Sequence, residues 1–462
     1  MLPNTGLIRS AQSGLRRQCL NTTIQHRGLA AAASGSFSYE TGDASGVKFA
    51  SRDIPGATTT LAVVARAGTR FQPYPGYSEA LHKYAFKGTT RRSALRINRE
   101  AELLGGQLFA YHTRENLVIG AKFLRDDLPY FTELLAEVVS QTRYTRHELE
   151  EEIVPAVQEE RKKLLKDVHG MAVNSAHAIA FHRGLGEPLH QTSSVAVNKY
   201  INNEWIHDWA STAYAKSNYA LVANGAQASE FSKWTKEFFS DAQIQTRQNA
   251  PSIDSTQSKY HGGEERIAHD GGNALVLAFP GSSSFTGGSW KPEIAVLASL
   301  LGGESSVKWA PGFSLLSKAT EAFPGAHITT QSATYSDAGL LHVSVTGKAT
   351  DVRSAGTEVV KAIKAVADGQ ISQEDFKKAV ATARFRALET GQSTEAGILQ
   401  TGAGLVHGGK AHQIDELGTS IGKVTESQLK TVAKTLLEGK ATVSSVGDLN
   451  ILPFAEEIGV QV

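Results

Sequence analysis

Short segments of alternating hydrophobic and polar residues are interspersed with longer segments of helical period along the first half of the chain. The alternation predicts strands that begin at Val47 and that cover residues 58–67, 107–111, 116–123 and 219–223. The helical period predicts helices over residues 77–89, 93–104, 127–141, 148–165, 196–214 and 229–239. The first half therefore contains enough strands for a sheet and enough helices to cover it.

After a polar stretch at residues 246–263, the same pattern returns. Four local features recur in one order: an Asp after the first strand, a Gly before a later strand, a Thr or Ser that caps a long helix, and a Gly after the last strand. They lie at residues 53 and 270, 106 and 325, 145 and 372, and 225 and 447. The nearly constant spacing of about 220 residues predicts a duplicated domain, with a repeat much longer than that of a solenoid.

Two such halves predict an α+β fold with two homologous domains in tandem. Each is expected to be a mainly antiparallel or mixed sheet covered by helices on one face. We expect a leader at residues 1–33, an N-terminal domain at residues 40–245, a linker at residues 246–263 and a C-terminal domain at residues 264–462.

The first 39 residues have the composition of a mitochondrial transit peptide. They contain four Arg, no Lys and no acidic residue before Glu40. Hydrophobic residues between Leu7 and Leu15 share one face of a helical projection, opposite Arg9 and Arg16. Cleavage within residues 27–33 would change the formal charge from +1 to −3. A mildly acidic mature protein gives no support for nucleic-acid binding.

The remaining composition narrows the chemistry further. Cys19 is the only cysteine, which excludes intramolecular disulfides, Cys-based zinc sites and iron–sulfur ligation. No run of 18 apolar residues occurs, so no transmembrane helix is predicted and any membrane attachment must come through partners.

The segment at residues 77–89, Y-S-E-A-L-H-K-Y-A-F-K-G-T, has the spacing of a zinc-peptidase helix but not its ligands. An H-x-x-E-H helix places two imidazoles four residues apart and puts the water-activating Glu beside the second. This chain has Glu79, His82 and Lys83 at those positions. An ammonium has no lone pair, so Lys83 cannot bind a metal ion and would repel it.

This helix resembles the zinc-binding helix of the pitrilysin or insulinase peptidases, closest to their processing-peptidase branch. The resemblance covers the chain from Val47 to the end. Residues 301–304 (LGGE), 314–318 (SLLSK) and 334–340 (TYSDAGL) look like the non-catalytic core subunits of respiratory complex III in the same family. The run Y-S-D-x-G-L supports the family more than the branch, whereas the altered helix and the leader favour the core-subunit branch.

The resemblance implies one further ligand in active members, a Glu well after the zinc helix, and either Glu159 or Glu160 stands at that distance. The favoured interpretation is that these two residues are solvated charges on a helix rich in Glu and Lys. A site rebuilt from Glu79, His82 and one of them is the alternative. We expect an inactive metallopeptidase homologue, with no catalytic residue, no bound metal and no cofactor.

The resemblance also implies a structural role on the matrix side of the mitochondrial inner membrane. The expected partners are a paralogous core subunit, cytochrome b, cytochrome c1 and the Rieske iron–sulfur subunit, in a dimeric complex. The alternative is a non-catalytic α-like subunit of a processing peptidase. Such subunits carry a glycine-rich loop, which here is reduced to Gly302, Gly303 and Gly312. A free-standing peptide-binding protein of the same fold is a third reading.

Other motifs are weaker. The glycine-rich stretches at residues 404–411 and 279–284 have only part of a phosphate-binding pattern. His177, His182 and His190 are spaced by five and eight residues, which does not stack them on one helix face. Trp205 and Trp209 are expected to be core or subunit contacts rather than parts of a cofactor site.

Overall fold

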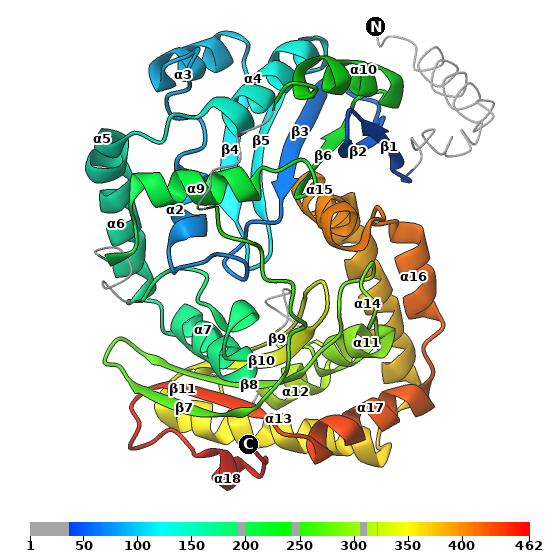
Figure 1. Ribbon diagram of the computed structural model, residues 1–462. Coiled ribbons are helices and arrows are strands. Elements are labelled where there is room, and N and C mark those ends of the chain that lie inside the picture. The colour runs from blue at the N-terminus through cyan, green and yellow to red at the C-terminus, as the bar shows by residue number, and fades with distance from the viewer. Residues whose placement is uncertain (1–36, 193–198, 243–249, 305–311, 321) are drawn as a thin grey trace, which may run out of the picture. The chain divides into compact units, whose positions relative to one another are not determined.

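The computed structural model describes residues 37–192, 199–242, 250–304, 312–320 and 322–462 (Figure 1). The expected leader at residues 1–33 lies outside these ranges. Among the described helices, none is both long and apolar enough to cross a membrane.

The elements of the first half appear in the predicted order, with two additions that the sequence analysis did not predict, strand β1 at the start and helix α7. They are β1 (Glu40–Ala44), β2 (Val47–Arg52), β3 (Thr58–Ala65), α2 (Tyr77–Lys83), α3 (Ala94–Leu103), β4 (Gln107–His112), β5 (Leu117–Leu124), η1 (Arg125–Asp127), α4 (Leu128–Gln141), α5 (Arg146–Glu148), η2 (Leu149–Ile153), α6 (Val154–Leu164), α7 (Val168–Phe181), η3 (Gly184–Gly186), α9 (Asn203–Ala213), β6 (Tyr219–Asn224) and α10 (Ala228–Phe239).

The second half repeats this arrangement after residues 250–262, which form no regular element. Its elements are β7 (Gly263–Ala268), β8 (Asn273–Pro280), α11 (Pro292–Leu301), α12 (Leu315–Thr320), β9 (Ala326–Thr334), β10 (Gly339–Gly347), α13 (Ala349–Asp368), α14 (Gln373–Gln392), α15 (Thr394–Ala403), η4 (Gly404–Gly408), α16 (Ile414–Gly422), α17 (Glu426–Glu438), β11 (Thr442–Gly447) and α18 (Ala455–Ile458). The domain limits given above stay a prediction.

The two halves contain sheets of the same topology. The first has the strand order β1-β2-β6-β3-β5-β4, and the second has β7-β11-β8-β10-β9. In each sheet one pair is parallel, β2 with β6 and β7 with β11, and the other neighbours are antiparallel. Apart from β1, the strands correspond one to one. The α+β class and the duplication are therefore confirmed.

One face of each sheet carries the expected helical layer. Along β3, Leu61 and Val63 point into the core under α4 and α10, while Ala62 and Val64 point to the opposite face. In the second half α13 lies along β8, β9 and β10 (Figure 1). The period of two in the sequence is thus the alternation of side chains between the two faces of a sheet.

The opposite face of each sheet is covered by a helix from the other half of the chain. Helix α7, from the first half, packs on β8 and β11 of the second sheet, where Ala172 and Ala176 meet Ala274 and Val276. Helix α15, from the second half, packs on β3 and β6 of the first sheet, where Ile398 contacts the apolar face that includes Val64. Both sheets are consequently buried on two faces, whereas the sequence predicted helices on one face.

Three predicted helices differ from the structure. The helix expected over residues 196–214 is regular only over Asn203–Ala213, and residues 196–198 lie outside the described ranges. The helix expected over residues 77–89 ends at Lys83, and Phe86 adopts a left-handed φ of 62° that a helix cannot continue through. The helix expected over residues 148–165 is interrupted by η2, a π turn in which the Val154 N–H bonds the Leu149 carbonyl five residues back. Pro155 follows directly and has no N–H to restore the α-helical pattern.

Candidate functional site

Helix α2 carries the three altered zinc positions on the wall of the first domain, next to β4, β5, α6 and α9. Its N-terminal residues face inward, and the Glu79 carboxylate is only 1% exposed. Helix α6 runs past its C-terminal end and brings Glu160 to it. The altered helix and the distal carboxylate therefore meet in the fold, as they do in the family the sequence resembles.

Glu160 faces α2 and Glu159 does not. The Lys83 ammonium lies 2.5 Å from Glu160 Oε1. Glu159 instead pairs with Lys162 at 2.6 Å, with a side chain that is 62% exposed. The sequence could not show which of the two residues is the distal carboxylate, because they are adjacent. The direction in which each side chain points from α6 identifies Glu160.

Burial and the Lys83 ammonium shift the pKa values of these two carboxylates in opposite directions. Burial raises the pKa of Glu79, against the lowering influence of His190. Burial would also raise the pKa of Glu160, but its contact with Lys83 outweighs this and leaves that pKa below its usual range. Burial thus favours the protonated form of Glu79, whereas the contact with Lys83 favours the charged form of Glu160.

His82 points away from this pair and joins a second imidazole. Its Nδ1 lies 3.0 Å from Nδ1 of His112, and Nε2 of His112 lies 2.8 Å from the carbonyl oxygen of Leu189. His112 therefore donates from Nε2 to Leu189 and accepts at Nδ1, so His82 donates from Nδ1. Burial, and then the neighbouring His112, lower the pKa of His82 to about 2. A neutral imidazole held in this way cannot take the place of the water-activating Glu.

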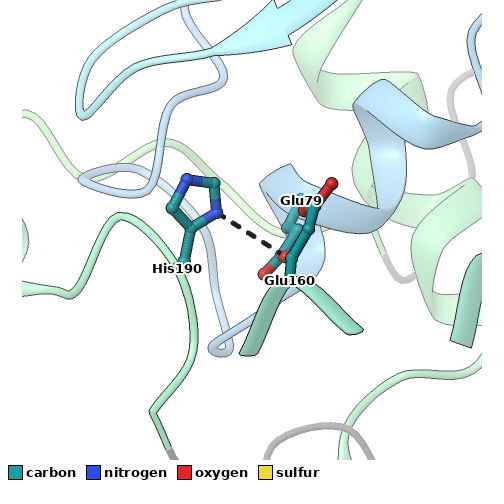
Figure 2. A group of neighbouring side chains, drawn as sticks. All are labelled: Glu79, Glu160 and His190. Atoms are coloured by element: carbon teal, nitrogen blue, oxygen red, sulfur yellow. Dashed lines mark ion pairs between the residues drawn. The ribbon is translucent and has the colours of Figure 1, made fainter. Parts of the chain in front are cut away.

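His190 is the residue that the sequence analysis did not connect to the site. It comes from the segment between α7 and α9, and its Nδ1 lies 3.7 Å from Glu79 Oε1. Figure 2 shows His190 facing Glu79 of α2 and Glu160 of α6. Ligand atoms of Glu79, Glu160 and His190 all lie within 4.8 Å of one another. No spacing rule could reveal this, because a loop residue has no fixed helical register.

The Y-S-D-x-G-L run has a structural role between the two halves. Asp337 binds the Arg70 guanidinium through two hydrogen bonds of 2.6 and 2.7 Å. The backbone N–H and the hydroxyl of Ser336 donate to the two oxygens of Glu115, at 2.8 and 2.6 Å. Tyr335 donates its hydroxyl to His177 Nε2 over 2.8 Å, since His177 Nδ1 donates to the Val173 carbonyl.

The glycine-rich stretches are used within the fold. The amides of Gly281 and Ser284 donate to the carbonyls of Gly339 and Tyr335, so they are not available to an anion. Residues 404–408 form a π turn directly after α15, without the preceding strand of a phosphate-binding loop. Gly302, Gly303 and Gly312 of the reduced glycine-rich loop each have a positive φ, and residues 305–311 between them lie outside the described ranges. Trp209 is fully buried and Trp205 is 47% exposed.

A cavity of about 460 Å³ lies between elements of both halves. Hydroxyl groups of β9, including Thr330 and Ser332, line one side, and Gln400 of α15 lines another. It contains none of the three altered zinc positions.

Comparisons with known proteins agree with this geometry. Residues 48–193 match the model of the insulinase family, peptidase family M16, and residues 200–383 match the model described as the peptidase M16 inactive domain. A solved protease from Helicobacter pylori superposes with a TM-score of 0.76 and 16% identity, covering 88% of this chain and 99% of that one. The two halves thus have the architecture of an M16 peptidase.

The chain belongs to the M16 peptidase family, and its nearer relatives are named for a respiratory complex. The mitochondrial cytochrome b-c1 complex subunit 2 of Neurospora crassa is 48% identical over 462 residues, which is 100% of both chains. The protein of the same name from Schizosaccharomyces pombe is 34% identical over 424 residues, 91% of this chain and 95% of that one. A mitochondrial-processing peptidase subunit alpha-2 of Dictyostelium discoideum is 25% identical over 418 residues, 88% of this chain and 90% of that one.

Proposed function

We propose that this chain is a non-catalytic core subunit of the mitochondrial cytochrome b-c1 complex, the ubiquinol–cytochrome c reductase or complex III. The observation that carries the proposal is the full-length similarity, at 48% identity, to a protein named as subunit 2 of that complex. Its role would be to support the assembly and stability of the complex, while other subunits carry out electron transfer.

The geometry of α2 supports the absence of peptidase activity. The second zinc-ligand position is Lys83, whose ammonium is held by Glu160 at 2.5 Å. His82 occupies the position of the water-activating carboxylate, and its Nδ1–H donates a hydrogen bond to His112. Neither a metal-bound water nor a base to deprotonate it can form in the arrangement that active members use.

The proposal places the protein as a peripheral subunit on the matrix side of the inner membrane. Its partners would be a core protein 1-like paralogue, cytochrome b, cytochrome c1 and the Rieske iron–sulfur subunit, in a dimeric complex. Attachment to the membrane would come only through these partners. The chain would carry no electron-transfer cofactor of its own and would bind no nucleic acid.

The experiment is a native gel of gently solubilised mitochondrial membranes, probed for this chain and stained for haem. Migration with the haem-stained complex, and loss of that band from cells that lack the chain, are the expected results. A soluble heterodimer that cleaves a presequence peptide, and that a chelator inhibits, would instead identify an α-like processing-peptidase subunit whose partner holds the zinc. A chain that migrates alone would contradict both.

A further inference from the structure

Four polar atoms without hydrogen-bond partners converge between α2, α6 and the segment that follows α7. They are both carboxylate oxygens of Glu79, Oε2 of Glu160 and Nδ1 of His190. Each of the four is hidden from solvent, and none has a hydrogen-bond partner within the described residues. Figure 2 shows the three side chains turned toward one another.

Such a concentration of unpaired groups is unusual in a folded protein. Most buried polar side-chain atoms have a partner, and each unpaired one costs about 1–3 kcal/mol, more where it is charged. A proton on Glu79 donated to Glu160 would pair two of the four atoms and leave the other two unpaired. A cation at the point where these atoms meet would give Glu79, Glu160 and His190 a partner at once.

The zinc arrangement of active family members does not fit here, because Lys83 has replaced an imidazole on α2. The three residues that do converge form a different set, with Glu79 on α2, Glu160 on α6 and His190 in the segment after α7. Their ligand atoms lie within 4.8 Å of one another, close enough for one ion to contact all three after small side-chain movements.

We propose that Glu79, Glu160 and His190 bind a divalent cation, and that Zn²⁺ is the ion that suits one imidazole and two carboxylates. The proposal departs from the sequence-based expectation of no metal, which considered Glu79, His82 and Glu159 or Glu160 but not His190. The ion would join α2, α6 and the segment before α9. It would be structural, because His82 cannot act as the catalytic base.

Lys83 has a defined place in this arrangement. It binds Oε1 of Glu160 and leaves Oε2, the unpaired oxygen, directed at the site. The ammonium thus orients a ligand, but its charge repels a second cation nearby. Replacing Lys83 with Met, which has a similar length and no charge, is expected to strengthen zinc binding.

The test is isothermal titration calorimetry of the purified full chain with ZnCl₂. One binding site per chain is expected, with a rise in the thermal unfolding midpoint when Zn²⁺ is added. Glu79→Gln and His190→Ala should each weaken the affinity for Zn²⁺ about tenfold or more. Loss of an outer-shell partner of a metal ligand already weakens affinity by about that factor, and these two residues are ligands themselves. Because the His190 side chain is 36% exposed, its truncation tests the site even if Glu79→Gln fails to fold.

His182→Ala is the matched control, since the exposed His182 ring stacks on His261 at 4.0 Å and could take up zinc at the surface. This variant should bind Zn²⁺ as the unaltered chain does. The proposal is overturned if the unaltered chain binds no zinc, if Glu79→Gln and His190→Ala bind it with unchanged affinity, or if only His182→Ala loses it.

Discussion

One guanidinium, that of Arg70, binds carboxylates from both halves of the chain. It lies 2.7 Å from Glu115 of the first half and 2.6 Å from Asp337 of the second, and its side chain is 6% exposed. The pKa of Asp337 is lowered, because hydrogen bonds from Arg70 and from the Ser258 N–H outweigh the effect of burial. The Y-S-D-x-G-L run therefore fastens the two halves together.

Arg70→Ala should destabilise the protein strongly, because it leaves Glu115 buried without its cationic partner. We expect a loss of about 3 kcal/mol in the free energy of unfolding, measured by urea titration. Arg70→Lys should lose less, since an ammonium keeps the charge but cannot make two parallel hydrogen bonds to Asp337. Arg146→Ala is the control, because its pair with Glu150 has side chains 77% and 57% exposed and should contribute little to the free energy of unfolding. Equal losses for Arg70→Ala and Arg146→Ala would contradict the prediction.

A buried imidazole should make the protein sensitive to acid. His342 on β10 is 3% exposed, and neither ring nitrogen has a hydrogen-bond partner among the described residues. Burial, with smaller contributions from His169 and Arg114, lowers the pKa of His342 to about 4. The unfolded chain takes up this proton near pH 6.5, so stability is lost as the pH falls from about 6.5 toward 4, by about 1.4 kcal/mol per pH unit.

His342→Leu should remove this part of the pH dependence. The difference in unfolding free energy between pH 7 and pH 5 should shrink by about 2 kcal/mol relative to the unaltered chain. His327→Ala, at an imidazole on β9 whose side chain is 64% exposed, should leave that difference unchanged. A His342→Leu variant with the same acid sensitivity as the unaltered chain would show that the imidazole is charged in the folded protein.

A glycine permits the close approach of α15 to the first sheet. A Cβ placed on Gly402 would lie 2.4 Å from Val64 Cγ2 and 2.5 Å from Val64 Cβ. Val64 is β-branched and lies in the interior strand β3, so it has little freedom to move. Gly402→Ala should cost about 1–3 kcal/mol in unfolding free energy.

Gly422→Ala provides the contrast at an exposed position of α16. A Cβ there has no neighbouring atom within 4 Å among the described residues, so the change should stabilise the helix by about 0.5–1 kcal/mol. Thermal unfolding of the two variants side by side measures the difference. If Gly402→Ala is as stable as Gly422→Ala, α15 does not need its close contact with β3.

The sequence was sufficient for the features that local pattern determines. The period-two alternation predicted strands β3 and β5, and the recurrence of four local features predicted the duplicated domain. The loss of the zinc ligand at Lys83 follows from residue type alone. Ser372 begins helix α14 as the predicted capping residue and accepts a hydrogen bond from the N–H of Asp375. The cap predicted at Thr145 is wrong, because this hydroxyl accepts no backbone N–H and donates to Glu148 instead.

The sequence was insufficient where side chains far apart along the chain meet. Both faces of β3 and β6 are apolar, but alternation cannot say which distant helix covers the second face. Helix α7, which the sequence analysis did not predict, presents Ala172, Ala176 and Ala180 to the second sheet. The contact between His190 and Glu79 was likewise not predictable, because it depends on the path of the loop that carries His190.

The exchange of α7 and α15 has a consequence for the order in which this protein can fold. As the chain emerges during synthesis, or from a translocation channel, the first sheet can pair its strands once residue 224 is present. Its second face, with Ala50, Val64 and Val222, has no cover until residues 394–403 arrive. Neither half can therefore complete its native structure alone. A nascent or truncated N-terminal half would expose an apolar sheet face, to which chaperones can bind. The two duplicated domains are therefore expected to fold together as one cooperative unit and not independently of each other.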